Sequence, residues 1–178
     1  MHTLLVIDMQ NAWLADPGTP RFDTAAMVTR INHAADAIRA QGGKVIFVQH
    51  ADEDAPIGSP AWNLLPSLHA ATDDARVHKV ACDAFAVTDL AQQLAGTAGG
   101  TLYICGLATE FCVDTTVRAA ASRGHDIVVL ADAHTTSNRP HLDAQSIIAH
   151  HNWVWSNMAV PANSALAVKT TSQAFPAA

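Results

Sequence analysis

One cysteine of this chain lies where a thiol could act as a nucleophile. Cys112 belongs to the segment TLYICGLATEFCVDTTVR (101–118), in which a buried-strand pattern runs to Cys105 and helical spacing begins at about Thr109, a hydroxyl residue suited to an N-cap. Strand, glycine, tight turn and helix would place Cys112 in the first helical turn, where unpaired backbone N–H groups favour a thiolate. The N–H groups of Ala108 and Cys112 would then face the oxyanion of a tetrahedral intermediate.

A lysine and an aspartate elsewhere in the chain are candidates for the cation and the proton acceptor that the thiol needs. Glu110 and Asp114 lie beside the thiol and oppose its ionisation, so a cation from elsewhere in the chain is needed. Lys79 ends a short strand pattern and is expected to lower the pKa of the thiol. Asp8 ends the first apolar run and could accept the thiol proton and return it to a leaving amine.

Buried strands alternate with helices along the segments that must position these residues. Apolar runs predict strands over 3–8, 44–49, 76–80, 101–105 and 126–130, with a weaker one over 153–158. Helical spacing is found over 27–38, 88–94, 109–120 and 142–150. This alternation indicates an α/β fold with a parallel sheet covered on both faces. Ligands bind such sheets beyond the carboxyl ends of the strands, where the three residues meet if the first and fourth strands are neighbours.

Composition limits the class of protein. A chain of 178 residues with 49% hydrophobic content is expected to form one domain over 1–178, in which 163–178 is a candidate for a loosely packed tail. The net charge of -6 argues against nucleic acid or an anionic membrane as partner, and no apolar run approaches the ~20 residues of a membrane span. Three cysteines without CxxC spacing, and an N-terminus that leads directly into a strand, favour a reducing cytoplasmic setting without a secretory signal.

Five blocks of the sequence carry a family signature. The first three are LLVIDMQN (4–11), VHKVACDAF (77–85) and CGLATEFCVDTTVRAA (105–120), and they are followed by DIVVLADAHTT (126–136) and IIAHHN (147–152). Together they resemble the isochorismatase-like cysteine hydrolases over nearly the whole chain. The resemblance implies a three-layer α/β/α fold whose six-stranded parallel sheet has the order 3-2-1-4-5-6. It also implies a catalytic triad of Asp8, Lys79 and Cys112, a cis peptide between Leu107 and Ala108, and a homo-oligomer, either dimer or tetramer.

Departures from the family pattern narrow the expected chemistry. Nicotinamidases of this family bind a metal through Asp-x-His and a further His after the second strand, a spacing that QHADEDAPIGSPAWNLLPSL (49–68) lacks. No metal or other cofactor is therefore expected, although His50 with Asp52 or Glu53 could bind an adventitious cation. Isochorismatases proper lack the cysteine and cleave a vinyl ether, so Cys112 favours an amide, carbamoyl or other C–N bond. The run after the second strand resembles the amidohydrolase branch that includes streptothricin hydrolase-like proteins.

Several other residues are candidates for the substrate pocket, and each also has a structural alternative. They are Gln10, Trp13, His50, Trp62, Phe85, Phe111 and His134. Trp62 and His50, on the irregular segment over 50–76, could instead form a lid or a subunit contact. Cys82 is expected to be a bystander near the site, and Cys105 to be packed in the core.

The interpretation that fits these residues best is a hydrolase of a small amide-like molecule that forms a thioester on Cys112. Three alternatives stay open: a non-catalytic protein that keeps the fold, a redox sensor in which Cys112 is oxidised or pairs with Cys82, and ether hydrolysis of the isochorismatase type. A dinucleotide-dependent oxidoreductase would need GxGxxG after the first strand, which VIDMQNAWLAD does not contain.

Overall fold

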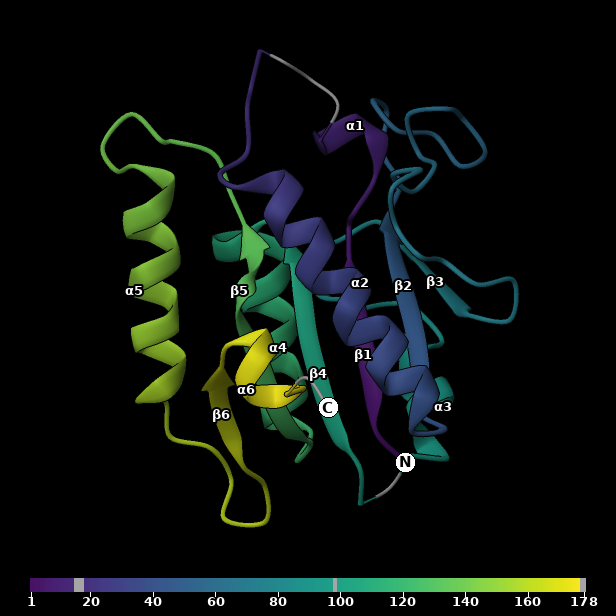
Figure 1. The fold of residues 1–178 in the computed structure, drawn as a ribbon, viewed down its shortest axis with the longest axis vertical. Coiled ribbons are helices and arrows are strands. Elements are labelled where there is room, and N and C mark those ends of the chain that lie inside the picture. The colour runs from purple at the N-terminus through teal and green to yellow at the C-terminus, as the bar shows by residue number, and fades with distance from the viewer. Residues whose placement is uncertain (15–17, 98, 177–178) are drawn as a thin grey trace.

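A six-stranded parallel sheet runs through the centre of the structure, and helices cover both of its faces (Figure 1). The computed structural model describes residues 1–14, 18–97 and 99–176. The strand order is β3-β2-β1-β4-β5-β6, which confirms the order that the family resemblance implies. The strands are β1 (Thr3–Ile7), β2 (Lys44–His50), β3 (Ala75–Lys79), β4 (Thr101–Leu107), β5 (Asp126–Thr135) and β6 (Leu166–Lys169).

The helices divide between the two faces of the sheet. They are α1 (Asn11–Leu14), α2 (Thr24–Ala40), α3 (Leu90–Ala95), the π-helix η1 (Thr109–Val113), α4 (Asp114–Ser122), α5 (Ala144–Ser156) and α6 (Thr171–Ala174). One core cluster joins the sheet to α3, α4 and α5, and a second joins its other face to α2 and the end of α6. Every residue of β1 is buried, as expected of a strand at the middle of a covered parallel sheet. No helix among the described residues has the length and apolar character needed to cross a membrane.

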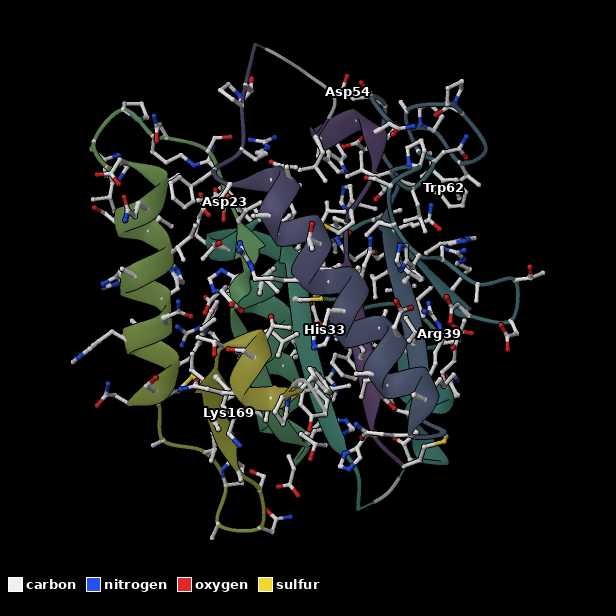
Figure 2. All side chains as sticks on the ribbon, viewed as in Figure 1. Asp23, His33, Arg39, Asp54, Trp62 and Lys169 are labelled. Atoms are coloured by element: carbon white, nitrogen blue, oxygen red, sulfur yellow. The ribbon has the colours of Figure 1, made fainter. Side chains whose placement is uncertain are left out.

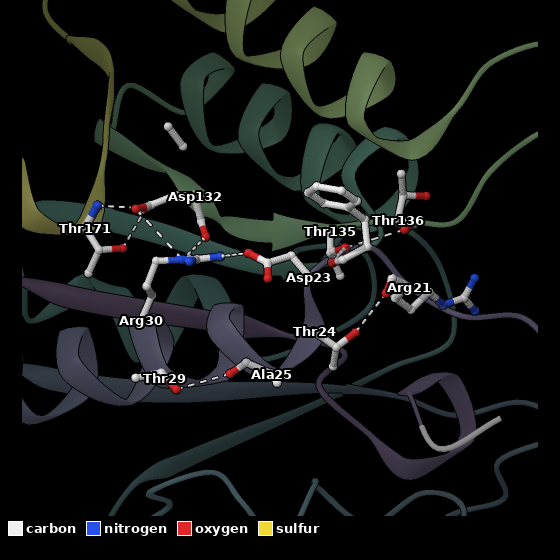
Figure 3. Close-up of polar contacts among 12 residues, drawn as sticks. Arg21, Asp23, Thr24, Ala25, Thr29, Arg30, Asp132, Thr135, Thr136 and Thr171 are labelled. Atoms are coloured by element: carbon white, nitrogen blue, oxygen red, sulfur yellow. Dashed lines mark hydrogen bonds and ion pairs between the residues drawn. The ribbon is translucent and has the colours of Figure 1, made fainter. Parts of the chain in front are cut away.

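Polar contacts fix α2 and α6 to β5, as Figure 3 shows. Arg30 of α2 forms an ion pair with Asp23 at 2.6 Å and donates to the backbone carbonyl of Asp132 on β5. The Asp132 side chain accepts in turn from the N–H and the hydroxyl of Thr171, both at 2.8 Å. One carboxylate therefore holds the start of α6 against the sheet.

The sixth strand does not lie where the sequence predicts it. The strand predicted over 153–158 is wrong, because most of this segment belongs to α5, where Trp155 is buried in the core and Trp153 faces outward. The observed strand, β6, pairs with β5 and lies inside the 163–178 segment, together with α6. The bulky and β-branched side chains at the end of α5 favour a strand locally, and packing of one helical face overrides that preference.

Gly106 lets β4 approach β1 closely just before the turn that carries Cys112. Its φ is +117°, and a Cβ atom at this position would lie 2.1 Å from the carbonyl oxygen of Ile7. The register between β4 and β5 also shifts between Ile104 and Gly106. Only glycine accepts both this backbone conformation and this distance, so the position of the turn depends on it.

Candidate active site

Four side chains from four different elements meet at the carboxyl edge of the sheet. Asp8 follows β1, His50 ends β2, Lys79 ends β3 and Cys112 lies in η1 after β4. The Lys79 ammonium nitrogen is 2.8 Å from Asp8 Oδ2, 3.1 Å from Cys112 Sγ and 3.1 Å from His50 Nδ1. The structure thus brings together the three residues proposed for chemistry and adds His50 to them.

The ion pair between Asp8 and Lys79 is almost completely buried. The Lys79 side chain is 0% exposed and that of Asp8 is 5% exposed. Burial raises the pKa of Asp8 above its ordinary value, and this effect outweighs the attraction of the Lys79 charge. Burial alone would lower the pKa of Lys79, but the negative charge of Asp8 and the hydrogen bonds to Asp8 and Cys112 reverse this and raise it. Lys79 therefore stays protonated, while Asp8 is well suited to accept a proton.

The Asp8 backbone is held in an unusual conformation. Its φ of 52° lies in the left-handed region, which aspartate tolerates better than most residues. Its N–H donates to the carbonyl of Val48 at 2.8 Å, which fixes the chain as it leaves the sheet. Oδ1 of Asp8 is buried and accepts no hydrogen bond from the residues that the structure describes. One carboxylate oxygen is thus held by Lys79 and the other is available for a proton.

The turn before Cys112 differs from the predicted α-helical start. Residues 109–113 form a π-helix, and the Ala108 carbonyl accepts from the N–H groups of Phe111 at 3.0 Å and Val113 at 3.2 Å. The predicted N-cap role of Thr109 is wrong, because Ala108 occupies that position. The peptide bond between Leu107 and Ala108 is cis. A π-helical turn is a common feature of functional sites, because the extra residue re-aims a side chain.

His134 braces the turn from behind. Its Nδ1 is 2.9 Å from the Thr109 hydroxyl and its Nε2 is 3.0 Å from Asn152 Oδ1. Burial lowers the pKa of His134 to about 4, so its ring is neutral at physiological pH. The neutral ring can donate to one of these partners and accept from the other.

The Cys112 thiol is protonated at rest rather than ionised. Burial and the nearby charge of Asp8 raise its pKa, and the opposing effect of the Lys79 ammonium is smaller. Lys79 lowers the pKa of the thiol, as expected, but burial and Asp8 outweigh it, so the net shift is upward. The thiol has to lose its proton during attack, with the Asp8 carboxylate beside it as acceptor.

The acidic residues flanking the thiol are each paired with a cation. Glu110 forms an ion pair with Arg139 at 2.6 Å. Asp114 pairs with Arg118 at 2.9 Å and also accepts from Trp155 Nε1 at 2.8 Å. The repulsion that these two carboxylates would exert on a thiolate is thus largely compensated.

A cleft of about 330 Å³ opens beside Cys112. Its lining residues are Asp8, Trp13, Arg21, His50, Asp52, Cys82, Leu107, Ala108, Phe111, Cys112 and Arg139. Sequence reasoning missed two of the cations, Arg21 and Arg139. Arg139 could have been suspected, because it follows β5 at the same edge of the sheet, whereas nothing in the sequence pointed to Arg21.

Comparison with known proteins identifies the family. The isochorismatase domain model matches residues 2–164. The chain belongs to the isochorismatase family. The crystal structure of another isochorismatase family protein superposes with a TM-score of 0.85 at 32% identity, covering 92% of this chain and 96% of that one.

Two curated relatives have named activities. A streptothricin hydrolase of Streptomyces noursei is 33% identical over 145 residues, which cover 79% of this chain and 56% of the relative. The ureidoacrylate amidohydrolase RutB of Stutzerimonas stutzeri is 28% identical over 168 residues, which cover 73% of this chain and 68% of the relative. This isochorismatase family chain thus spans about half the length of the streptothricin hydrolases that it matches.

Four of the residues expected in the pocket lie elsewhere in this isochorismatase family chain. Gln10 is buried behind His50, and its side-chain amide donates to the carbonyls of His50 and Trp62, both at 2.9 Å. Trp62, labelled in Figure 2, lies on the loop over 51–74 between β2 and β3, with its ring centroid 4.8 Å from that of His78. Phe85 is packed in the core cluster on the α3 and α4 face, and His134 braces the turn. Trp13, His50 and Phe111 do line the cleft.

The site contains a group of potential metal ligands, but a lysine already occupies its centre. One ligand atom each from Asp8, His50 and Cys112 lies within 4.8 Å of the others. The Lys79 ammonium hydrogen-bonds all three, so its positive charge stands where a cation would bind. His50 and Asp52 are the other pair considered for binding a cation. His50 Nε2 lies 3.6 Å from Asp52 Oδ2, which is the length of a weak ion pair.

Proposed function

We propose that this protein hydrolyses a C–N bond of a small amide or carbamoyl compound through a thioester on Cys112. The observation that carries the proposal is the buried Lys79 ammonium, which contacts both Asp8 and Cys112 beside an open cleft. The amidohydrolase name of one relative supports the type of bond. Family membership supports hydrolysis more broadly.

In the first step, Cys112 Sγ attacks the substrate carbonyl as its proton passes to Asp8. The raised pKa of Asp8 makes the carboxylate a better proton acceptor than an ordinary aspartate. Lys79 keeps its charge and stabilises the sulfur as the S–H bond breaks. The Ala108 and Cys112 N–H groups would stabilise the oxyanion of the tetrahedral intermediate.

In the second step, Asp8 returns the proton to the leaving nitrogen as the C–N bond breaks. Ammonia or an amine departs and an acyl thioester remains on Cys112. Water then attacks the thioester and gives one proton to Asp8. When the C–S bond breaks, the acid product leaves and the sulfur takes that proton back, which restores the starting state.

The walls of the cleft limit the size and polarity of the substrate. A volume of about 330 Å³ suits a small molecule, and Trp13 and Phe111 offer aromatic faces to it. Arg21 and Arg139 add guanidinium groups, which match carboxylate or carbonyl oxygens. This combination fits a small acyl or ureido compound that carries a further oxygen-bearing group.

Assembly and setting are part of the same proposal. The family resemblance extends the proposal to a homo-oligomer, dimer or tetramer, and Trp153, 65% exposed on α5, is a residue that a subunit contact would cover. A reducing cytoplasmic setting would keep the nucleophile in its thiol form.

A panel of primary amides, ureido compounds, lactams and one vinyl ether tests the proposal, with ammonia release measured for the first two classes and product mass for the lactams and the ether. At least one compound should be turned over, and intact mass should show an acyl adduct on Cys112. Cys112→Ala should abolish turnover and keep the circular dichroism spectrum. Cys82→Ser, which changes another thiol of the same cleft, should retain activity. Full turnover by Cys112→Ala would refute the mechanism. If the vinyl ether were the only compound cleaved, ether hydrolysis would replace C–N hydrolysis as the reaction.

A further inference from the structure

His50 completes the hydrogen bonding of the catalytic lysine. A lysine ammonium has three N–H donors and no acceptor. Lys79 has three partners in the structure: Asp8 Oδ2, Cys112 Sγ and His50 Nδ1. Because the ammonium can only donate, His50 Nδ1 must be the unprotonated, accepting nitrogen. Its ring hydrogen is therefore on Nε2, which faces Asp52 Oδ2 at 3.6 Å.

The position of His50 is fixed by elements on both sides. Its backbone N–H donates to Gln10 Oε1 at 2.7 Å, and its carbonyl accepts from Gln10 Nε2 at 2.9 Å. Its ring lies edge-on to Trp13 with centroids 6.1 Å apart. His50 and Lys79 are also cross-strand partners in the register of β2 and β3. These contacts hold Nδ1 toward the ammonium without help from a bound ligand.

We propose that His50 is a positioning residue, which holds the Lys79 ammonium against Cys112 and Asp8 by accepting its third hydrogen bond. This rests on the proposed function, in which Cys112 is the nucleophile. Without that acceptor, one N–H of a fully buried ammonium would be unsatisfied, a situation that side chains avoid by moving. Lys79 would then turn away from the sulfur, and Cys112 would ionise less readily.

The charges around His50 make this role dependent on pH. Burial and the neighbouring Lys79 charge lower the pKa of His50 from 6.5, while Asp8 and Asp52 act in the opposite direction. Cys112 is the remaining titratable group in contact with the Lys79 ammonium. Protonated His50 would lose its acceptor at Nδ1 and place a second positive charge 3.1 Å from the ammonium. The arrangement should therefore persist to below pH 6.5 and fail in more acidic solution.

Two variants of similar size separate the hydrogen bond from simple packing. In His50→Asn, Oδ1 stands on Cγ as Nδ1 does and can accept from Lys79, but it does not titrate. In His50→Leu, the side chain fills comparable space and accepts nothing. The probe is the rate of Cys112 alkylation by iodoacetamide between pH 5 and 8, in a Cys82→Ser background.

We expect His50→Leu to be alkylated about tenfold more slowly than the parent at pH 7.5, the size of effect that one hydrogen bond to a charged group has. His50→Asn should stay within about twofold at that pH. It should also overtake the parent in acidic solution, because only the parent loses its acceptor there. Parent-like alkylation of His50→Leu, or equal slowing in both variants, would overturn the proposal.

The tautomer of His50 gives a test that needs no reactive thiol. Imidazole ¹⁵N spectra of the labelled protein, assigned by loss of the signal in His50→Asn, should show Nε2 protonated and Nδ1 unprotonated near pH 7.5. A proton on Nδ1 would overturn the proposal even if the variants differ in rate. The expected tautomer in a protein whose Cys112 is inert would uphold the placement of His50 and refute the proposed function instead. The same spectra decide the matter if His50→Leu does not fold.

Discussion

Replacing Lys79 by methionine would leave the Asp8 carboxylate as an uncompensated charge inside the protein. The two side chains are 0% and 5% exposed, with 2.8 Å between Nζ and Oδ2. Removing one partner of such a buried pair costs about 3–5 kcal/mol, because the remaining charge stays desolvated. Methionine fills much of the same space, so a cavity adds little. We expect the free energy of unfolding to fall by about 3–4 kcal/mol at pH 7.5.

The sign of the pH dependence follows from Asp8. Without Lys79, the folded-state pKa of Asp8 rises further above the unfolded-state value of about 3.9. Between these two values the folded state binds more protons, so the Lys79→Met variant becomes more stable as the pH falls and less stable as it rises through the folded-state pKa. The deficit relative to the parent should therefore shrink between pH 7.5 and pH 5.

Urea unfolding, followed by circular dichroism at both pH values, measures these changes. The double variant Asp8→Asn/Lys79→Met should recover most of the loss, since no buried charge remains. Lys169→Met, at an exposed position of β6, is the control and should change stability by less than about 0.5 kcal/mol. A double variant as unstable as Lys79→Met, or a deficit that does not vary with pH, would refute the reasoning.

Three other changes test the turn that carries Cys112. Gly106→Ala should lose at least about 3 kcal/mol of stability in urea unfolding or fail to fold, because the new Cβ would lie 2.1 Å from the backbone of β1. Arg139→Ala should slow alkylation of Cys112 about threefold, because the charge of Glu110 loses its ion-pair partner. The double variant with Glu110→Gln should restore the rate, and a rate that stays low would assign the effect to packing. The folded-state pKa of His134 is about 4 and its unfolded-state pKa is about 6.5. Between these values the unfolded chain binds more protons than the folded protein, so stability falls as the pH drops. His134 should contribute about 1.5 kcal/mol to that fall between pH 6.5 and 5, and His134→Gln should flatten the slope of stability against pH; an unchanged slope would contradict this.

The strands that the sequence predicts well are those with both faces buried. All of Thr3–Ile7 is buried, so apolar residues occupy consecutive positions and the pattern is unambiguous. β6 was missed because it is four residues long, at an edge of the sheet, and at most half-buried. The segment around Trp155 was predicted as a strand but is helical. Its helix depends on tertiary packing, because the Trp155 ring is buried in the core and its Nε1 donates to Asp114.

The sequence predicts the position of a site residue well when that residue lies at the end of a strand. Asp8 directly follows β1 and Lys79 ends β3, and the topology of the sheet brings those two strand ends together. The contact between His50 and Lys79 also needs the register of β2 against β3, which one strand's pattern does not specify. The pairing of Arg139 with Glu110 joins the loop after β5 to the π-helix η1, and no periodic pattern in the sequence specifies where that loop lies.

The bracing of the Cys112 turn also sets an order in which the protein matures on the ribosome. The residues that hold this turn, His134 against Thr109 and Trp155 against Asp114, are translated after the cysteine itself. At about 5–20 residues per second, several seconds separate Cys112 from Trp155. Until both bracing residues have been made and packed, the contacts that hold the thiol in its native position are missing. Docking of α5 therefore has to precede a correctly held nucleophile, and β6 and α6, which are made later still, complete the sheet and its cover.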